Sequence, residues 1–498
     1  MKYVIFIPDG SSDYPIDELD GKTPLQVART PNIDKLAQNG FGGFTNNVPD
    51  GYTPGSDVAN MSIFGYNPAD FYTGRGPLEA GSVGIDTNPT DIIFRCNTIT
   101  EKDDMMEDFN AGHITSEEAA VLMDALNEYF TEKYDGFKGK FYAGISYRHL
   151  FVYSCDNEED ADILANLETV PPHDISGENL GEYTAWNEDL AAKIRNIMYE
   201  AQDVLKDHEI NKKRIAEGKN PANMVWLWGQ GPTPKLSDFK ETYGLTGAVI
   251  TGVDLLKGIG VFANLDVIDV PGATGFFDTD YKAKGQYGIE ALKNHDVLFI
   301  HIEAPDEAGH AQLIDEKVRA IERIDEFIVG PVIDSLEGQD FKAAILPDHP
   351  TPISIGTHTR DDVPLVIYSS DKTGDECTSF DEEGVKTGSI EKQEGYKEEE
   401  KLDGYDPYSN SKSCSEIITH SYVNSFFKEL NIPTSTARAG NVIGGGDFAK
   451  DRIIPDCVKS ALNNSNLMIR NPYSTRPYQH VLDPLNVYLI IVKSSMEM

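Results

Sequence analysis

Three short apolar runs in this chain are each followed closely by residues that can bind a metal ion. The runs span residues 3–7, 297–302 and 343–346. Their length and apolar content predict buried strands of a parallel sheet. The residues that follow them are Asp9, then Asp306 with His310, then Asp348 with His349. Because ligands of open α/β sheets bind at the carboxyl ends of the strands, we expect these residues to share a site there.

The residue types in this group are those that bind divalent cations. Asp306 and His310 are four residues apart, so on a helical turn they share a face. His358 follows Asp348 along the chain and adds a further imidazole. Oxygen and nitrogen ligands without cysteine favour Mn²⁺ or Zn²⁺, and the adjacent Asp348 and His349 favour a site for two ions. For any one aspartate, the alternative is a turn or a helix N-cap.

Ser56 is the candidate nucleophile. It stands in Pro54-Gly55-Ser56-Asp57, directly before a stretch that predicts a short helix ending at Gly65. At a helix N-terminus, the serine hydroxyl lies where backbone N–H groups favour an anion. A bound divalent ion would lower the pKa of that hydroxyl and make it a nucleophile. The alternative is an ordinary N-cap role.

Five segments of the first part of the chain form a specific set of motifs. They are Ile7-Pro8-Asp9-Gly10, Pro54-Gly55-Ser56-Asp57, Gly74-Arg75-Gly76-Pro77-Leu78-Glu79-Ala80, Glu303-Ala304-Pro305-Asp306-Glu307-Ala308-Gly309-His310, and Asp348-His349-Pro350-Thr351-Pro352 followed by Thr357-His358-Thr359. In combination, these segments resemble the archaeal-type cofactor-independent phosphoglycerate mutases, which belong to the alkaline phosphatase superfamily. The resemblance runs from Met1 to about Gly395.

This resemblance implies a reaction and a set of roles. The implied reaction interconverts 3-phosphoglycerate and 2-phosphoglycerate in glycolysis, without 2,3-bisphosphoglycerate, through a phosphoserine at Ser56. It also implies two metal sites, one formed by Asp9, Ser56, Asp348 and His349 and the other by Asp306, His310 and His358. Mn²⁺ is the expected metal, with Zn²⁺, Co²⁺ and Mg²⁺ as alternatives. The alternative activity is that of a related phosphotransferase with another hydroxyl acceptor, such as homoserine.

Phosphoryl transfer depends mostly on positioning and charge, so the site needs cations around the substrate. Arginine suits phosphate and carboxylate because its planar group can bond two oxygens at once. The candidate substrate-binding residues are Arg75, Arg95, Arg148, Lys284, His173 and Asp174. We expect His173 and Asp174 to handle protons at the glycerate hydroxyls. A surface ion pair is the alternative for each cation.

The long separation of Ser56 from Asp306 predicts a discontinuous catalytic domain with an inserted cap that closes over the substrate. The expected fold class is α/β, with an alkaline-phosphatase-like parallel sheet between helices, an inserted α/β cap domain and a truncated Rossmann-like C-terminal fragment. The expected ranges are 1–95 and 276–395 for the metal-binding domain, 96–275 for the cap and 396–498 for the fragment. Within the cap, we expect helices at 117–130 and 189–205 and a strand at 224–228.

Charge limits the partners of this chain. Its 82 acidic and 43 basic residues give a formal net charge of −39. Such a surface repels nucleic acid and anionic membranes, so neither is an expected partner, and a phosphorylated small molecule needs locally positive groups. Five dispersed cysteines predict reduced thiols in a cytoplasmic protein, and no segment is long and apolar enough to span a membrane. The oligomeric state stays open.

The C-terminal part carries different motifs. After a charged linker at about 388–403, Tyr408 and Lys412 form a Tyr-x-x-x-Lys pattern, in which the ammonium can lower the pKa of the phenol. This pattern is accompanied by motifs at residues 437–447, 451–456, 470–472 and 476–481. Together they resemble the extended short-chain dehydrogenases, most closely CDP-glucose 4,6-dehydratases. No glycine-rich turn precedes Tyr408, so we expect a vestigial fragment that does not bind NAD.

Overall fold

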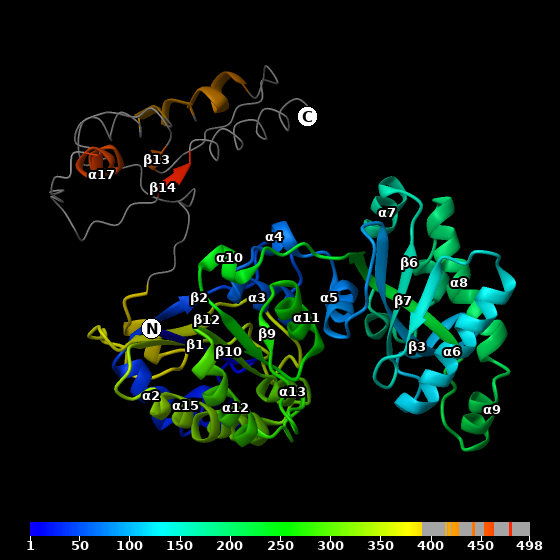
Figure 1. The fold of residues 1–498 in the computed structure, drawn as a ribbon, viewed down its shortest axis with the longest axis horizontal. Coiled ribbons are helices and arrows are strands. Elements are labelled where there is room, and N and C mark those ends of the chain that lie inside the picture. The colour runs from blue at the N-terminus through cyan, green and yellow to red at the C-terminus, as the bar shows by residue number, and fades with distance from the viewer. Residues whose placement is uncertain are drawn as a thin grey trace. The chain divides into compact units, whose positions relative to one another are not determined.

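The chain forms two compact units, Met1–Lys392 and Gln393–Met498 (Figure 1). The computed structural model describes residues 1–390, 414–415, 417–419, 421–427, 441–443, 453–462 and 478–480. The candidate metal-binding and substrate-binding residues all lie in the first unit. Tyr408 and Lys412 lie outside the described residues, so the vestigial site predicted for them stays a prediction.

A seven-stranded sheet organises the first unit, in the order β2-β12-β11-β1-β10-β8-β9. Its strands are β1 (Lys2–Pro8), β2 (Phe41–Thr45), β8 (Gly247–Ile250), β9 (Asp266–Val267), β10 (Val297–Ile302), β11 (Phe341–Ile345) and β12 (Val363–Ser369). β1 pairs parallel with both β10 and β11, and β8 continues the parallel part between β10 and β9. β12 and β2 extend it antiparallel. The three strands predicted from the apolar runs are thus confirmed, and they lie side by side.

Helices cover both faces of this sheet because its strands are apolar on both sides. Alternate residues of β1 point to opposite faces: Val4 and Phe6 pack into one core, and Ile5 and Ile7 contact the other. The first core is closed by α2 (Pro31–Gln38), α12 (Tyr281–Asn294), α14 (Ile314–Ile324) and α15 (Gly330–Ser335). The second core is closed by α3 (Ser56–Ile63), α10 (Phe239–Tyr243) and α11 (Asp254–Phe262). The predicted α/β class is confirmed.

The remaining helices of this part are short. They are α1 (Pro24–Val27), α4 (Pro68–Phe71), α5 (Arg75–Ser82) and α13 (Ala304–His310). α5 lies where the chain passes from the first sheet to the second (Figure 1). Gly76 permits this packing, because a Cβ there would lie within 3 Å of the backbone of Ile93, Phe94 and Arg95. The helix therefore rests directly on the first strand of the second sheet.

The second sheet is antiparallel and has five strands. They are β3 (Asp91–Lys102), β4 (Met105–Asp108), β5 (Gly139–Tyr142), β6 (Arg148–Ser154) and β7 (Met224–Pro232). The long β3 pairs with β4, β6 and β7. Helices α6 (Ser116–Lys133), α7 (Glu158–Ala165), α8 (Asp189–Leu205) and α9 (Glu209–Ala216) complete this region. The helices and the strand predicted within the cap are confirmed as α6, α8 and β7.

The boundary of the inserted segment differs from the expected 96–275. The second sheet begins at Asp91 and ends at Pro232, whereas β8 and β9 pair within the first sheet. β8 is only four residues long, and its membership depends on its parallel register with β10, in which Gly247 lies opposite Val297. A strand this short carries no sequence pattern that indicates its partner, so its place in the first sheet could not be predicted.

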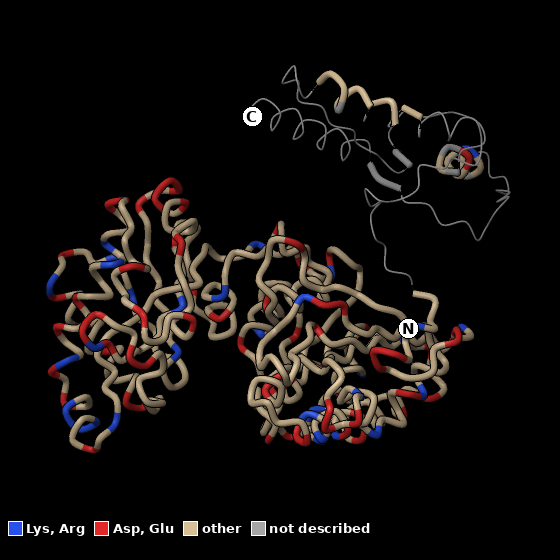
Figure 2. The backbone as a smooth tube through the Cα atoms, turned by 180° about the vertical axis from the view of Figure 1, so that it is seen from behind, with Lys and Arg blue, Asp and Glu red and all other residues tan. Residues whose placement is uncertain are grey.

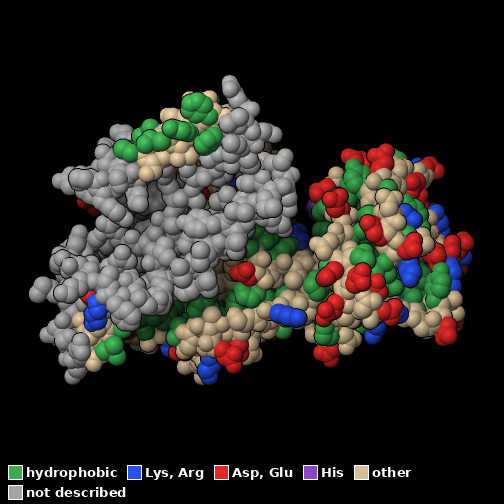
Figure 3. All heavy atoms as spheres, turned by 90° about the horizontal axis from the view of Figure 1, so that it is seen from above, with side chains coloured by type: hydrophobic (Ala, Val, Ile, Leu, Met, Phe, Trp, Pro, Cys, Tyr) green, Lys and Arg blue, Asp and Glu red, His purple; other side chains and the backbone are tan. Residues whose placement is uncertain are grey.

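Acidic residues occur throughout the backbone trace of the first unit, with lysine and arginine residues among them (Figure 2). Figure 3 shows the same mixture on the visible face of the region that contains the second sheet. On this visible face, basic side chains lie among acidic ones and do not form the large basic surface that a nucleic-acid partner would need. Among the described residues, no helix is long and apolar enough to cross a membrane.

The described part of the second unit contains a small parallel pairing. β13 (Asn441–Ile443) pairs with β14 (Tyr478–His480), and α17 (Ile453–Leu462) lies between them in the sequence. Parallel strands need a crossover connection of this kind, usually a helix. The segment therefore has the connectivity of a βαβ unit.

Candidate active site

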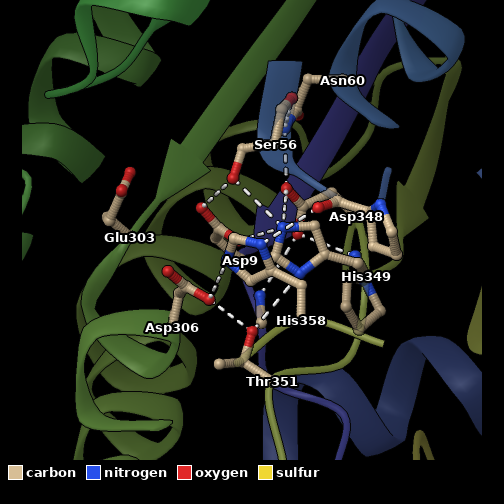
Figure 4. Close-up of polar contacts among 12 residues, drawn as sticks. Asp9, Ser56, Asn60, Glu303, Asp306, Asp348, His349, Thr351 and His358 are labelled. Carbon is tan, nitrogen blue, oxygen red and sulfur yellow. Dashed lines mark hydrogen bonds and ion pairs between the residues drawn. The ribbon is translucent and has the colours of Figure 1, made fainter. Parts of the chain in front are cut away.

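The carboxyl ends of β1, β10 and β11 meet and bring together the acidic residues predicted from the three apolar runs (Figure 4). Asp9 follows β1, Asp306 lies on α13 after β10, and Asp348 follows β11. None of the three is more than 3% exposed. The strand order explains this arrangement, because β1 lies between β10 and β11.

Gly10 allows these strand ends to approach one another so closely. Its φ of +60° lies in the left-handed region, and a Cβ there would be 2.6 Å from both Asp306 Oδ1 and Thr351 Oγ1. Its backbone N–H donates to Asp348 Oδ1 at 3.2 Å. The Thr351 hydroxyl donates to Asp306 Oδ1. A glycine is therefore required between the loops that carry the acidic residues.

The first group of candidate ligands surrounds the Ser56 hydroxyl. Ser56 Oγ lies 3.1 Å from His349 Nε2 and 3.4 Å from Asp9 Oδ2. His349 Nε2 in turn lies 3.7 Å from Asp9 Oδ1 and 3.5 Å from Asp348 Oδ2. Ligand atoms of Asp9, Asp348 and His349 all lie within 4.8 Å of one another, a spacing that can hold a metal ion. The hydroxyl thus faces a compact set of oxygen and nitrogen atoms.

The position of Ser56 on α3 argues against the N-cap alternative. Gly55 is the N-cap residue, and the Ser56 hydroxyl contacts Asp9 and His349. One turn along the helix, Asn60 donates from Nδ2 to Ser56 O and to Asp348 Oδ2, both at 2.8 Å. Asn60 is fully buried and ties the serine helix to the loop after β11. The Ser56 hydroxyl is thereby held toward Asp9 and His349 (Figure 4).

The second group of candidate ligands surrounds Asp306. His310 Nε2 lies 3.2 Å from Asp306 Oδ2, and His358 Nε2 lies 3.5 Å from Asp306 Oδ1. The two imidazole nitrogens are themselves 3.0 Å apart. Asp306, His349 and His358 also have ligand atoms within 4.8 Å of one another. This arrangement agrees with the helical spacing of Asp306 and His310 and brings His358 in from a different loop.

Electrostatics make this cluster favourable for cations. Burial and the nearby Asp348 and Asp306 raise the pKa of Asp9 well above its usual range. Although burial opposes it, hydrogen bonds from His310 and His358 hold the pKa of Asp306 well below its usual range. The hydrogen bond to Asp306 raises the pKa of His310 to about 9. Buried carboxylates that repel one another are stabilised by a bound cation, which is the property expected of a metal site.

Two of the candidate arginines are paired with carboxylates close to the serine helix or on α5. Arg75, the first residue of α5, pairs through Nε with Asp57 Oδ2 at 3.0 Å, next to Ser56. Arg95 on β3 pairs with Glu79 at 3.2 Å, and its guanidinium carbon lies 4.5 Å from the centre of the Trp228 ring. Both arginines therefore have carboxylate partners, and neither is simply an exposed surface cation.

Arg148 is the first residue of β6, and His173 lies in a short helical turn, Pro172–Ile175, of the same region. The side chain of His173 is half exposed. Its pKa is lowered by burial, and also by the charges of Arg75, Arg95 and His310. Arg148 acts electrostatically on Arg95 and on Glu307, the residue after Asp306. Asp174 is largely exposed and lies 3.4 Å from His173. Arg148 and His173 thus act electrostatically on residues in or next to the acidic cluster, whereas Asp174 pairs with His173.

Lys284 has different surroundings. It is fully buried on α12, and its ammonium donates to the backbone oxygen of His301 at 3.1 Å. Burial lowers the pKa of Lys284 to about 8, and Glu303 is the charge that most opposes this effect. Lys284 therefore contacts the end of β10, and not Arg75, Arg95 or Arg148.

Several residues of the site have no signal that sequence reasoning detected. They are Asn60, Thr351, His301 and Glu303. Asn60 could have been found from its spacing, because it stands four residues after Ser56 on the predicted helix. His301 lies inside the apolar run of β10, where an imidazole is ordinarily a structural residue. Only the strand pairing brings it to Asp9, with His301 Nε2 3.0 Å from Asp9 Oδ2.

Fold and site together define an α/β protein in which a serine is held inside a buried cluster of candidate metal ligands. Residues 37–211 match the model of the family described as 2,3-bisphosphoglycerate-independent phosphoglycerate mutase. A mutase of that name from Methanothermobacter thermautotrophicus is 50% identical over 390 residues, which are 78% of this chain and 94% of the relative. One from Methanosarcina acetivorans is 50% identical over 394 residues, which are 78% and 96% of the two chains. The chain belongs to the 2,3-bisphosphoglycerate-independent phosphoglycerate mutase family.

Solved structures agree with this assignment. A Pyrococcus horikoshii protein is 31% identical with a TM-score of 0.65, and the match covers 78% of this chain and 92% of that one. A cofactor-independent phosphoglycerate mutase from Thermoplasma acidophilum is 27% identical with a TM-score of 0.53, covering 78% and 96%. These matches extend over the same share of the chain as the relatives do.

Proposed function

We propose that this protein is an isomerase that interconverts 3-phosphoglycerate and 2-phosphoglycerate, without 2,3-bisphosphoglycerate, through a phosphoserine at Ser56. Its place would be glycolysis in the cytoplasm. The observation that carries the proposal is the position of the Ser56 hydroxyl, 3.1 Å from His349 Nε2 and 3.4 Å from Asp9 Oδ2. A serine hydroxyl becomes a nucleophile when neighbouring groups stabilise its ionised form. The family of the chain supplies the substrate class.

The residues fit two divalent cations, for which Mn²⁺ is the first choice. One would be held by Asp9, Ser56, Asp348 and His349, and the other by Asp306, His310 and His358. Two observations support this fit. The buried Asp9 Oδ1 has no hydrogen-bond partner among the described residues, and the imidazole nitrogens of His310 and His358 lie 3.0 Å apart beside one carboxylate. When bound, such ions lower the pKa of the serine hydroxyl and offset the charge of the phosphoryl group.

The chain's own residues would divide the remaining work. Ser56 Oγ forms a bond to phosphorus while the bond from phosphorus to the glycerate oxygen breaks. His173 donates the proton that this oxygen needs. Glycerate then turns within the site, its other hydroxyl attacks the phosphoserine as His173 takes up a proton, and Ser56 is released. Arg75, Arg95 and Arg148 orient the phosphate and carboxylate throughout.

We further propose that residues 91–232 act as a cap on a domain formed by residues 1–90 and 233–390. Glycerate must stay bound while it turns, and water must not take the phosphoryl group, so the site needs a cover during the reaction. The support is electrostatic: Arg95, Arg148 and His173 of this region interact with Arg75 and Glu307 of the other region.

For residues 396–498, we propose a partial short-chain dehydrogenase fragment that contributes nothing to the mutase reaction. Its sequence motifs support this proposal, as does the βαβ connectivity of β13, α17 and β14. Without a glycine-rich turn for the pyrophosphate, NAD binding is not expected. Purified full-length protein should therefore lack bound NAD when its absorbance is measured.

An enolase-coupled assay of the full chain tests the proposed function. We expect turnover of 3-phosphoglycerate with Mn²⁺ and without 2,3-bisphosphoglycerate, and loss of that turnover in Ser56→Ala. Ser62→Ala is a matched control, because Ser62 lies on the same helix but bonds only to Val58 O at 3.2 Å. It should keep wild-type activity.

A folded, Mn²⁺-loaded protein without turnover would contradict the mutase proposal. The phosphoryl acceptor would then be sought with homoserine and with water, by measuring phosphohomoserine formation and phosphate release. Turnover that persists in Ser56→Ala would contradict the role of the serine.

A further inference from the structure

A third group of potential metal ligands lies beside the proposed two-metal site. Ligand atoms of Asp9, His301 and Glu303 all lie within 4.8 Å of one another. His301 Nε2 is 3.0 Å from Asp9 Oδ2, and His301 Nδ1 is 3.9 Å from Glu303 Oε2. Asp9 is shared with the proposed site around Ser56, whereas His301 and Glu303 have no role in the proposed two-metal site. The group is therefore an additional centre of negative charge at the end of β10.

Three atoms of this group are buried without a hydrogen-bond partner among the described residues: Asp9 Oδ1, His301 Nε2 and Glu303 Oε2. Asp9 and His301 are fully buried. In Figure 4, Glu303 is drawn without a dashed contact to the other residues shown. Buried polar atoms of this kind are costly unless a positive charge or a donor compensates them.

The compensating charge is present in the chain itself. Lys284 is fully buried, and its ammonium lies 3.1 Å from the backbone oxygen of His301. Burial lowers the pKa of Lys284, and the charge of Glu303 opposes this effect. Burial and the charge of Asp306 raise the pKa of Glu303 well above its usual range, and the charge of Lys284 opposes that rise. Lys284 and Glu303 thus act on each other electrostatically, and the Lys284 ammonium bonds to the backbone of His301, a member of the third group.

We propose that the ammonium of Lys284 takes the place of a third metal ion, so that the site binds two divalent cations and no more. This inference rests on the proposed two-metal function. Two divalent cations offset four carboxylates, those of the buried Asp9, Asp306 and Asp348 and that of the partly exposed Glu303. The ionised Ser56 hydroxyl adds one negative charge, and Lys284 supplies the matching positive charge. A third divalent ion would leave the buried cluster positively charged before any substrate enters.

The contacts of Lys284 also differ from those of the candidate substrate-binding arginines. Its ammonium is enclosed and bonded to a strand carbonyl, so it would have to leave His301 O to reach a bound phosphate. From the sequence alone, Lys284 is a candidate substrate ligand. In this proposal it is instead a positioning residue for the charges around Asp9.

Counting bound Mn²⁺ tests this proposal on the full chain. Protein stripped with EDTA is reloaded with excess Mn²⁺ and desalted, and the metal is counted by mass spectrometry, with electron paramagnetic resonance to follow each equivalent. We expect two Mn²⁺ in the wild type and three in Lys284→Met, which removes the charge but keeps the length of the side chain. The double variant Lys284→Met/Glu303→Gln should return to two.

Lys317→Met is the matched control. Lys317 is also fully buried, but it pairs with Asp13 at 2.7 Å and does not touch the third group. Its loss should lower stability without adding a metal ion. If Lys284→Met unfolds in EDTA, we expect Mn²⁺ to restore its folding and the double variant to fold without metal; failure of both would contradict the proposal.

The remaining outcomes are distinct. Three Mn²⁺ in the wild type would show that an ion, and not the ammonium, occupies the third group. Two Mn²⁺ in Lys284→Met, with only a raised KM for phosphoglycerate, would show a substrate ligand and overturn the proposal. Fewer than two Mn²⁺ in the wild type would overturn the proposed two-metal function together with this inference.

Discussion

The two sheets of the first unit contribute to the site in opposite ways. The parallel strands of the seven-stranded sheet end in Asp9, Asp306 and Asp348, which are buried and held by one another's loops. The antiparallel sheet supplies Arg95 and Arg148, and His173 of the same region has a half-exposed side chain. The groups proposed for the chemistry are therefore buried, whereas those proposed for substrate recognition include the half-exposed His173.

The largest effect should come from a buried histidine of the parallel region. His349→Ala removes the imidazole that contacts Ser56 Oγ at 3.1 Å, and we expect kcat to fall by more than about 10³-fold. His149→Ala is the matched change in the antiparallel region, where the imidazole accepts from Gly144 N. It should lower stability but leave Mn²⁺ binding intact. Equal losses of Mn²⁺ binding in both folded variants would remove the distinction between the regions.

A smaller effect is expected from the antiparallel region. Arg95→Met removes a guanidinium next to Trp228, and we expect kcat/KM to fall about 10- to 100-fold, mainly through KM, because a charged hydrogen bond contributes about 1.5–3 kcal/mol. Arg95→Lys should recover little, because an ammonium cannot bond two oxygens in one plane. Steady-state kinetics check this. A fall in kcat alone would show that Arg95 acts in the chemical step and not in substrate binding.

Asn60 tests how rigidly the parallel region is held. Asn60→Ala deletes two buried hydrogen bonds of 2.8 Å, to Ser56 O and Asp348 Oδ2. We expect about 1–3 kcal/mol less stability and about 10-fold weaker Mn²⁺ binding. Denaturant unfolding and calorimetric titration measure the two quantities. Unchanged Mn²⁺ affinity would show that the ligands do not depend on this support.

The smallest effect concerns pH. The hydrogen bond to Asp306 raises the pKa of His310 from 6.5 to about 9, so its protonated form stabilises the metal-free protein fully below about pH 6.5. That contribution is lost as the pH rises through about 9. About a third of the side chain is exposed, so solvent limits the contribution to about 1 kcal/mol or less. Urea unfolding in EDTA should detect it, and His310→Gln should abolish it; an unchanged slope in that variant would contradict the assignment.

Mn²⁺ binding should show the opposite trend, because a ligand imidazole must be neutral. Affinity is expected to increase over the same pH range, and less steeply in His310→Gln. This dependence would connect the second ligand group to the cation directly.

Much of the fold and of the candidate site could be predicted because their signals are local. The apolar runs before Asp9, Asp306 and Asp348 indicate parallel strands without knowledge of their neighbours, and the spacing of Asp306 and His310 indicates one helical face. Ser56 could be placed at a helix start from the glycines around it. Each of these patterns lies within a single segment, so it can be recognised without knowing which segments are neighbours in the fold.

The parts that could not be predicted depend on contacts between distant segments. β8 belongs to the first sheet because Gly247 pairs opposite Val297, and no residue within β8 indicates this partner. His301 and Lys284 lie on different elements and meet only through the packing of α12 on β10. The balance of charges around Asp9 therefore depends on the tertiary structure and could not be predicted from the sequence.

The central claim is that Ser56 carries the phosphoryl group, and trapping the phosphoenzyme tests it most directly. Full-length protein with Mn²⁺ is mixed with 3-phosphoglycerate, quenched in acid within a single turnover and digested for mass spectrometry. We predict a phosphorylated peptide whose modified residue is Ser56, absent from His349→Ala. A phosphate on another residue, or full mutase turnover in Ser56→Ala, would contradict the account.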